Sequence, residues 1–316
     1  MASRNTDGSV RPMAENAPGE TSRDPIKCDI DAVVSIIDEL GAEERKPMTR
    51  TAGLCEFDLW ADISDLATWR DALERTGLSH FRPHRRMGHR FFIGFGSEGW
   101  VKVDVKLRNG DSGRLLGDLA WLLRRRRGMV VALLGADGSG KSTAVTCVER
   151  SLPIDAISRY LGTKPRSRPD DRESRRSSLP FRSYLGLVKW IPRIIRQLWS
   201  LEAAARRGTV VICDRHPIEA GRLGAEPPLV KVAKRVVVRF LAPRPDLVIL
   251  LDAPGELLYA RKGEHSPEHL NRMTETWRQV MRSVDGVSVS AELPAEDVCH
   301  RIQEQIWIRL ADRRAC

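Results

Sequence analysis

The residues best suited to chemistry form a glycine-rich segment near the middle of the chain, Gly135-Ala136-Asp137-Gly138-Ser139-Gly140-Lys141-Ser142-Thr143. The segment fits the pattern GxxxxGK[ST]. An apolar run precedes it and a helical pattern follows it, which is the context that the motif requires. Glycines allow backbone N–H groups to turn toward a phosphate, and the start of the helix adds a positive dipole end. The spacing therefore predicts an ATP-binding P-loop.

Two side chains of this segment have distinct expected roles. Lys141 offers a point charge to the β and γ phosphates, and Ser142 offers a hydroxyl group to Mg²⁺. The motif alone does not name a reaction, because GTPases, motor ATPases, transporters and small-molecule kinases share it. The reaction must be predicted from the rest of the chain.

A second group of candidate residues follows the apolar run at 209–214. The expected strand ends at Asp214, and Arg215 and His216 come next. Ligands of open parallel sheets bind at the carboxyl ends of the strands. Asp214 could there hold Mg²⁺ or orient an acceptor, and Arg215 can bind a phosphate with two hydrogen bonds. An ordinary strand-end salt bridge is the alternative interpretation of these residues.

A third group lies on two expected helices after the apolar run at 246–252. Arg261 and Lys262 lie near the end of the first helix, and Arg272 lies in the second, beyond the polar loop GEHSP. Such a pair of helices can close over a nucleotide, and its cations can stabilise charge on a transferring phosphoryl group while water is excluded. A solvated basic helix is the alternative.

Alternating strands and helices must position these groups. Apolar runs occur at 129–135, 154–162, 209–214, 246–252 and 286–290. Helical patterns separate them, at 142–151, 186–207, 230–241, 267–284 and 294–312. Runs without polar alternation are typical of strands buried on both faces of a parallel sheet. Residues 129–312 are therefore expected to form an α/β P-loop NTPase domain, a parallel sheet with helices on both faces.

A smaller α+β domain is expected at residues 26–110. It combines helical patterns with a strand and a strand hairpin, at 29–41, 65–77, 55–63 and 89–107. Residues 1–25 are polar and aperiodic, which predicts a disordered tail. Residues 111–128 are expected to form a connecting helix that ends in the basic run Arg124–Arg127.

The first domain has a candidate site of its own. Glu56 and Asp58 are two residues apart on one expected strand, so they share a face, and Asp104 lies on a later strand. The pattern weakly resembles a nucleotidyltransferase core, in which three such carboxylates hold two Mg²⁺ ions. The usual Gly-Ser turn is absent and the first acidic residue is Glu. A degenerate, non-catalytic domain for substrate binding or assembly is therefore the main hypothesis. An active transferase and an unrelated fold are the alternatives.

Composition limits the class of partner and the location. The formal net charge of +10 favours anionic partners, among them nucleotides, phosphorylated substrates, nucleic acid and acidic membrane surfaces. No segment reaches the ~18 apolar residues of a membrane span, and no secretory signal is seen at the start of the chain. The six cysteines are scattered without a CxxC pair, so neither a disulfide framework nor a zinc site is expected. These features predict a cytoplasmic protein without a membrane partner.

His80, His84 and His89, in a basic loop without a nearby acidic partner, are expected to be surface residues.

In order and spacing, GADGSGKST, VVICDRH and PDLVILLDAPGELLYARKGE resemble the thymidylate kinase-like branch of the nucleoside monophosphate kinases. The resemblance covers about 129–312. It implies that Lys141 and Ser142 handle the phosphates of ATP and Mg²⁺, that Arg215 grips the phosphate of the acceptor, and that Asp137 faces the acceptor or the metal. It implies lid roles for Arg261, Lys262 and Arg272.

Two departures from this family leave the acceptor open. After DRH the chain continues PIEAGRLGAEPP in place of a serine-rich stretch. Residues 163–186 form a long basic insertion, expected to be a mobile loop at the acceptor site.

The main hypothesis is transfer of the γ-phosphoryl group of MgATP to an anionic small molecule, with a nucleoside monophosphate as the first candidate. One alternative is a kinase of an unphosphorylated nucleoside, sugar or secondary metabolite, with Asp214 as base. Another is a nucleotide-dependent nucleic-acid-binding protein that uses Arg124–Arg127 and 163–186; without aromatic clusters beside these arginines, base stacking has little support. Related kinases suggest a homodimer.

Overall fold

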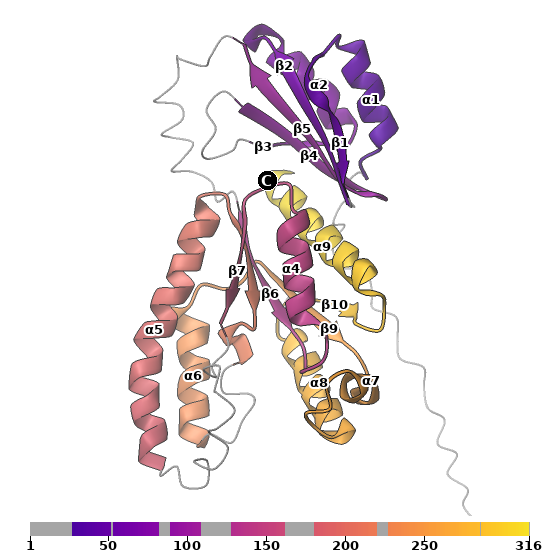
Figure 1. Cartoon of the computed structure of the whole chain (residues 1–316). Coiled ribbons are helices and arrows are strands. Elements are labelled where there is room, and N and C mark those ends of the chain that lie inside the picture. The colour runs from indigo at the N-terminus through magenta and orange to yellow at the C-terminus, as the bar shows by residue number, and fades with distance from the viewer. Residues whose placement is uncertain are drawn as a thin grey trace, which may run out of the picture.

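The computed structural model describes residues 27–51, 53–81, 89–108, 128–161, 180–219, 227–284 and 286–315. These residues form two five-stranded sheets, one in each half of the chain (Figure 1). The predicted tail at 1–25, the run Arg124–Arg127 and residues 163–179 of the insertion lie outside the described residues.

The first sheet has the strand order β1-β2-β5-β4-β3. Its strands are β1 (Glu43–Thr51), β2 (Leu54–Ala61), β3 (Ser79–Phe81), β4 (His89–Gly96) and β5 (Gly99–Leu107). Strand β2 runs parallel to β5, and β4 and β5 form the predicted antiparallel hairpin. The sequence did not predict β1 or β3, because β1 is exposed along almost its whole length and β3 has only three residues.

Two helices cover one face of this sheet, α1 (Ile30–Glu39) and α2 (Leu66–Arg75). Side chains alternate between the faces of a strand, and in β2 the alternation is complete, with Cys55, Phe57 and Leu59 buried and Glu56 and Asp58 on the other side. The buried set packs with residues of both helices in one hydrophobic cluster. The acidic pair therefore faces away from α1 and α2.

The second sheet is entirely parallel, with the order β10-β9-β6-β8-β7. Its strands are β6 (Met129–Leu134), β7 (Ala156–Tyr160), β8 (Val210–Asp214), β9 (Leu247–Asp252) and β10 (Gly286–Ser290). Each of the five apolar runs contains one of these strands. The central strand β6 is buried at every position, as expected for a strand that is covered on both faces.

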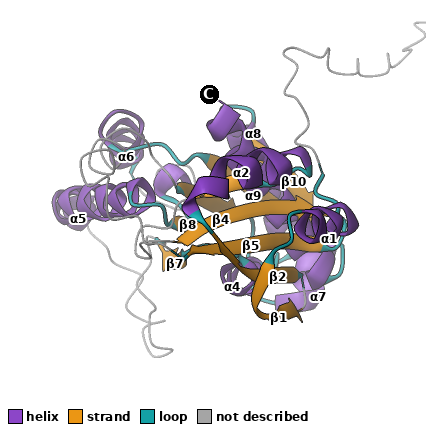
Figure 2. Ribbon diagram, turned by 90° about the horizontal axis from the view of Figure 1, so that it is seen from above, coloured by secondary structure: helices purple, strands orange, loops and turns teal. Residues whose placement is uncertain are grey.

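Helices pack on both faces of the second sheet. They are α4 (Lys141–Ser151), α5 (Pro180–Arg206), α6 (Pro228–Leu241), α7 (Gly255–Lys262), α8 (Pro267–Met281) and α9 (Ala295–Ala315). Val131 and Leu133 of β6 pack with α4 and α9, whereas Val130 packs with α5, and Ala132 and Leu134 pack with α8. Helices α5 and α6 lie side by side (Figures 1 and 2). The α/β fold with helices on both faces is confirmed.

One boundary differs from the prediction. Helix α5 begins at Pro180 rather than at Gly186, so the last residues of the basic insertion at 163–186 are helical and not part of a loop. The sequence did not predict this start because the insertion is polar.

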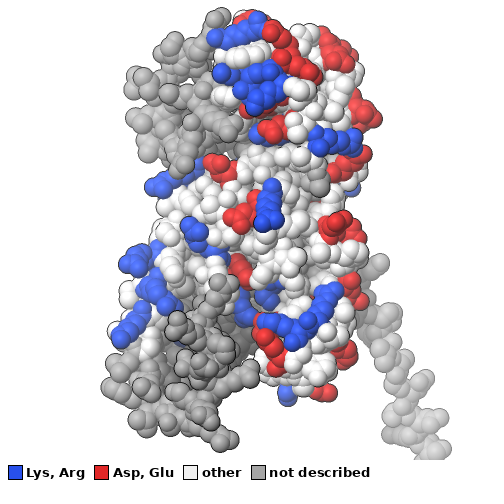
Figure 3. Space-filling view, viewed as in Figure 1, with Lys and Arg blue, Asp and Glu red and all other residues white. Residues whose placement is uncertain are grey.

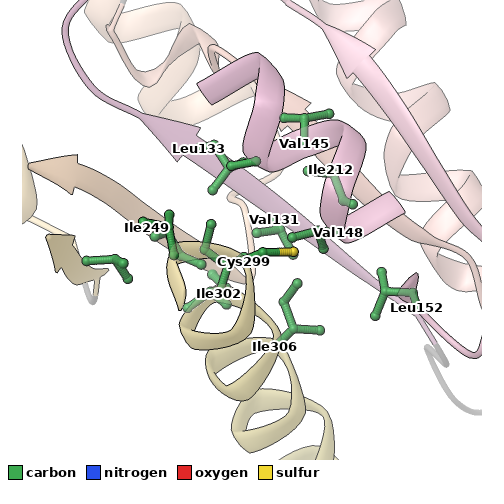
Figure 4. Packing of buried hydrophobic residues seen from close by; sticks show 14 of the residues in the cluster. Val131, Leu133, Val145, Val148, Leu152, Ile212, Ile249, Cys299, Ile302 and Ile306 are labelled. Carbon is green, nitrogen blue, oxygen red and sulfur yellow. The ribbon is translucent and has the colours of Figure 1, made fainter. Parts of the chain in front are cut away.

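A disulfide joins α4 to α9 through Cys147 and Cys299, whose Cα atoms lie 6.3 Å apart. The close view shows Cys299 among the apolar side chains that lie between these helices (Figure 4). The sequence predicted no disulfide framework, and for this pair the expectation is wrong. The two cysteines are 152 residues apart, and only the packing of two helices on one sheet face brings them together.

Helix α9 also contacts the first sheet. The ring of Trp307 meets that of Trp100 edge-on at 6.0 Å, and the ring of His300 lies 4.9 Å from that of Phe95. These contacts extend the hydrophobic cluster of the second sheet into the first, so the two halves share a core. No helix among the described residues is long and apolar enough to cross a bilayer.

Candidate functional site

The carboxyl ends of three neighbouring strands bring the candidate residues together. Strand β6 leads into the P-loop, β8 ends at Asp214 and β9 ends at Asp252. Leu133 of β6 is paired in register with Asp214, so the end of β8 lies directly beside the P-loop. This edge is where open parallel sheets bind ligands.

Glycine is required at several positions of the P-loop. Gly135, Gly138 and Gly140 have φ angles of 147°, 91° and 83°, which side-chain-bearing residues rarely adopt. A Cβ atom on Gly138 would lie 2.7 Å from the carbonyl oxygen of Leu258. The loop can therefore curl its backbone N–H groups inward only with glycine at these positions.

Lys141 is held inside the loop that it closes. Its side chain is buried, and its Nζ donates hydrogen bonds to the carbonyl oxygens of Gly135 and Ala136 at 2.9 and 2.6 Å. The cation thus lies within the curve of the P-loop, where the motif expects phosphate groups.

Ser142 and Asp214 meet across the strand edge. The hydroxyl group of Ser142 donates to Oδ2 of Asp214 at 3.0 Å. The other carboxylate oxygen, Oδ1, is buried and has no hydrogen-bond partner among the described residues. A hydroxyl and a carboxylate oxygen with free acceptor capacity are the hard oxygen ligands that suit Mg²⁺, so the pair fits the ion.

Arg215 and Asp137 form an ion pair over the P-loop. Arg215 has a φ angle of 63°, the only positive φ of a non-glycine residue in the described chain, and its backbone N–H reaches the carbonyl of Leu133 at 3.3 Å. Burial acts to raise the pKa of Asp137, but the guanidinium of Arg215, together with Lys141, Lys262 and His265, lowers this pKa below its ordinary value. The Asp137 carboxylate is therefore held as an anion.

The turn after β8 is anchored by His216. Its side chain is only 2% exposed, and its Nδ1 accepts a hydrogen bond from the N–H of Ile218 at 3.2 Å. Burial lowers the pKa of His216 to about 4, so the imidazole is neutral at physiological pH. Ile218 in turn packs against the apolar cluster beneath α8, which fixes the turn that presents Arg215.

The loop between α7 and α8 reaches the P-loop through His265, which the sequence did not single out. Nε2 of His265 lies 4.0 Å from Oδ2 of Asp137, and Nζ of Lys262 lies 3.1 Å from Oε2 of Glu264. Asp137, Glu264 and His265 are the one group of three potential metal ligands found among the described residues. Arg215 and Lys262 already pair with its two carboxylates, which opposes a metal there.

The other two expected lid residues lie elsewhere. Arg261 donates to the carbonyl oxygen of Ala291 at 2.8 Å, and Arg272 lies on the exposed side of α8. The described residues show no hydrogen bond or ion pair from either arginine to the P-loop. A pair that the sequence missed links this helix to the strand edge, because Arg278 donates two hydrogen bonds to Asp252 at 2.9 and 3.2 Å.

The histidines of the first domain differ from the prediction of surface residues. His89 is mostly buried, and its Nδ1 lies 2.8 Å from Oδ1 of Asp104, an acidic partner distant in sequence. His80 is partly buried and its ring lies 5.0 Å from that of Phe92. His84 lies outside the described residues. The β4–β5 hairpin explains the error, because it brings Asp104 opposite the start of β4.

Comparison with known proteins finds no family model that matches the sequence. A thymidylate kinase of Xanthomonas euvesicatoria is 28% identical over 201 residues, 59% of this chain and 86% of that protein. A probable thymidylate kinase of Pyrobaculum aerophilum is 32% identical over 140 residues, 42% of this chain and 68% of that protein. A solved deoxyadenosine kinase of M. mycoides is 14% identical, with a TM-score of 0.41 over 56% of this chain and 98% of that one.

Proposed function

The chain belongs to the thymidylate kinase family, and from this premise we propose that it transfers the γ-phosphoryl group of MgATP to a nucleoside monophosphate. The observation that carries the proposal is the position of Arg215, which the left-handed turn after β8 presents to the P-loop residue Asp137. An arginine beside a P-loop supplies the planar, two-pronged donor that an acceptor phosphate needs. Thymidylate is the first candidate acceptor, because the relatives are named for it.

The proposed mechanism is positioning and neutralisation of charge, which a loose phosphoryl-transfer transition state requires. Lys141 would exchange its bonds to Gly135 and Ala136 for the β and γ phosphates of ATP. Arg215 would leave Asp137 for the phosphate of the acceptor. Asp137, then free, would accept a hydrogen bond from the acceptor or orient a bound water.

Mg²⁺ would be held by Ser142 and, directly or through water, by Asp214. When bound, the ion neutralises charge on the phosphate oxygens. The buried, unpartnered Oδ1 of Asp214 supports this assignment.

Closure of the α7–α8 loop is proposed as the step that completes the site. Lys262 is already close enough to lower the pKa of Asp137. Arg261 and Arg272 are proposed to join on closure, as their counterparts in the family resemblance imply. Closure would exclude water from the phosphoryl group in transit.

The test is ADP release from MgATP across a panel of acceptors. The panel holds the nucleoside monophosphates, their parent nucleosides, sugars, sugar phosphates and a control without acceptor. ADP release with thymidylate or another monophosphate alone is expected. Release at the control rate with every monophosphate would contradict the proposal.

A second candidate function is supported by the same unpartnered oxygen of Asp214. A buried carboxylate oxygen at the strand edge could accept the proton of an alcohol, so that an unphosphorylated nucleoside, sugar or secondary metabolite would be the acceptor. In the panel, ADP release with unphosphorylated acceptors would favour this function. The Asp214→Asn variant would then lose turnover while its KM for the acceptor stays the same.

A homodimer is proposed through the outer face of α6. Leu229, Val232, Val236 and Phe240 follow a spacing of three and four residues and are exposed by 46% to 72%. An apolar stripe of this kind is typical of an interaction surface, and a two-fold axis would pair it with itself. Helix α5 lies beside α6, and Figure 3 shows basic and uncharged side chains on the described surface over α5. Light scattering should give twice the chain mass for the native protein and the single mass for Phe240→Glu.

The cytoplasm remains the proposed location, because MgATP is consumed there. The Cys147–Cys299 disulfide would be reduced in that compartment, which a count of free thiols can test.

A further inference from the structure

The face of the first sheet that points away from α1 and α2 has two halves. In one half, Phe95 and Trp100 pack against α9. In the other half lie the three carboxylates that the sequence compared with a nucleotidyltransferase core. Asp58 and Asp104 are direct partners in the β2–β5 ladder, and Glu56 is two residues from Asp58 on the same face. The acidic residues are therefore brought together as the resemblance predicted.

Each of these carboxylates is already paired with a cationic or imidazole group of the chain. Nη2 of Arg45 lies 2.7 Å from Oδ1 of Asp58 and 3.7 Å from Oδ2 of Asp104. Nδ1 of His89 lies 2.8 Å from Oδ1 of Asp104. Glu56 accepts a hydrogen bond from Nζ of Lys102 at 2.5 Å. The guanidinium of Arg45 thus bridges the two aspartates.

A β-bulge explains why Arg45 reaches this position. In the pairing of β1 with β2, Glu44 is opposite Leu59 and Lys46 is opposite Asp58, so Arg45 is the extra residue at a register shift. A bulge bends a strand and re-aims a side chain. Here Arg45 is partly buried between exposed neighbours, with its guanidinium directed onto the acidic face.

The fit of a metal pair to this site can be judged from these contacts. Two Mg²⁺ ions need several carboxylate oxygens free to coordinate and close to one another. The oxygens of Asp58 and Asp104 instead bind one guanidinium between them. Among the described residues, these three carboxylates do not form a group with metal-ligand spacing. Asp104 is also only 1% exposed. The residues present do not fit the metals.

We infer that Arg45 occupies the place of a divalent cation between Asp58 and Asp104, so that the first domain has no metal-dependent nucleotidyl transfer and serves as a docking unit for α9. The ion network ties β1 to the sheet, and the other half of the same face carries the aromatic contacts to Trp307 and His300. The sheet therefore keeps the acidic positions of a catalytic core while its charge is neutralised internally.

Titration with Tb³⁺ tests the inference on the full chain. Trp60 lies on the same strand face as Asp58, two residues away, so a Tb³⁺ ion bound by the aspartates would give tryptophan-sensitised luminescence. The wild-type protein and Asp58→Asn should give the same titration curve. Any Tb³⁺ bound at the P-loop region contributes equally to both curves, because that region is unchanged in both proteins. Arg45→Ala and Arg45→Gln should each gain a site at least tenfold tighter than any Asp58-dependent site of the wild type.

The gained site should disappear in Arg45→Ala combined with Asp58→Asn. Arg50→Ala is the matched control, because Arg50 lies on the same strand but pairs with Glu98 on the surface. An Asp58-dependent site in the wild type would overturn the inference. So would the absence of a gained site in folded Arg45→Ala and Arg45→Gln proteins, with folding checked by circular dichroism.

Release of pyrophosphate is the second measurement. Nucleotidyl transfer from a nucleoside triphosphate breaks the bond between the α and β phosphates and releases pyrophosphate, whereas a kinase releases ADP. Wild-type protein with each of the four common Mg-nucleoside triphosphates should release no pyrophosphate above background. Pyrophosphate release that Asp104→Asn abolishes would overturn the inference, whatever the outcome of the ADP assay.

Discussion

Lys141 holds the P-loop together through its side chain and is also the residue that we propose binds the phosphates of ATP. Its Nζ donates hydrogen bonds to the carbonyl oxygens of Gly135 and Ala136, and these bonds compensate the burial of the charge. In the proposed mechanism, phosphate oxygens take over as the partners of Nζ. Removal of the cation should therefore affect the reaction more than the fold.

We expect Lys141→Ala to lower kcat by about 10²–10³-fold, the range for loss of one charge-stabilising group. The measurement is ADP release under saturating MgATP and acceptor, with circular dichroism as the check on folding. Arg150→Ala, at the far end of the same helix, should retain full activity. Substantial residual turnover in folded Lys141→Ala would count against the proposed mechanism.

Arg215 is the residue that we propose binds the phosphate of the acceptor and not ATP. Hydrogen bonds to charged groups contribute about 1.5–3 kcal/mol, and each 1.4 kcal/mol is about tenfold in affinity. Arg215→Ala should raise the KM for a nucleoside monophosphate by about 10- to 100-fold and leave the KM for ATP nearly unchanged. Arg215→Lys should recover part of the loss. An equal rise of both KM values would mean that Arg215 acts only on the structure of the loop.

At the scale of elements, the turn after β8 depends on a buried neutral histidine. The pKa of His216 is about 4 in the folded chain, below the ordinary value of about 6.5. Between these pH values the unfolded chain binds the proton and the folded chain does not. Stability therefore rises with pH through this window and is lost as the pH falls from about 6.5 toward 4.

We expect urea unfolding to show that the free energy of unfolding falls between pH 6.5 and pH 4. The fall should reach up to about 3 kcal/mol for a pKa shift of this size. His216→Asn should keep the acceptor for the N–H of Ile218 and remove most of the dependence on pH between 4 and 6.5. His265→Gln, at an exposed histidine of the α7–α8 loop, is the control and should keep the dependence of stability on pH. A wild-type protein equally stable at pH 4.5 and pH 7 would contradict burial of a neutral His216.

The disulfide between α4 and α9 is a second stabilising feature at this scale. It links the helix that follows the P-loop to the helix that contacts the first domain. A disulfide typically stabilises a fold by about 2–4 kcal/mol. Reduction of the oxidised protein should therefore lower its Tm by several degrees.

Thiol titration in denaturant is the measurement that accompanies the melting curve. The chain has six cysteines, and a protein with the Cys147–Cys299 bond should present four of them. Cys299→Ser should melt at the same temperature with and without reductant. A count of six thiols in protein prepared under oxidising conditions would contradict the bond.

At the scale of the whole molecule, α9 packs against both sheets, so we expect the two halves to unfold as one cooperative unit. Trp100 and Trp307 are almost fully buried and meet edge to face, a geometry that aromatic pairs favour. The hydrophobic cluster runs through both halves without a break. Removal of either tryptophan side chain should therefore destabilise both sheets.

We expect Trp307→Ala to lower the free energy of unfolding by about 3–5 kcal/mol, the range for removal of a large buried aromatic side chain. Hydrogen exchange should accelerate both in β4 and β5 and in α4. Trp199→Ala, at a half-exposed tryptophan of α5, should change stability by less than about 0.5 kcal/mol. Acceleration confined to the second sheet would show that the halves unfold independently.

Much of the site was predictable because its signals are local. The P-loop spacing, the five apolar runs and the Asp at the end of the third run each lie within a few residues of sequence. Parallel topology then requires that the strand ends meet at one edge, which places Asp214 beside Ser142. The sequence by itself thus determined the P-loop, the parallel sheet and the acidic pair on β2.

Only the tertiary structure decided which charges meet. Arg45 reaches the acidic face through a bulge, His89 finds Asp104 across a hairpin, and Cys147 meets Cys299 after 152 residues. Arg215 faces Asp137 because a left-handed turn follows β8. These contacts join segments distant in sequence, and their geometry depends on register and helix packing, which no local pattern encodes.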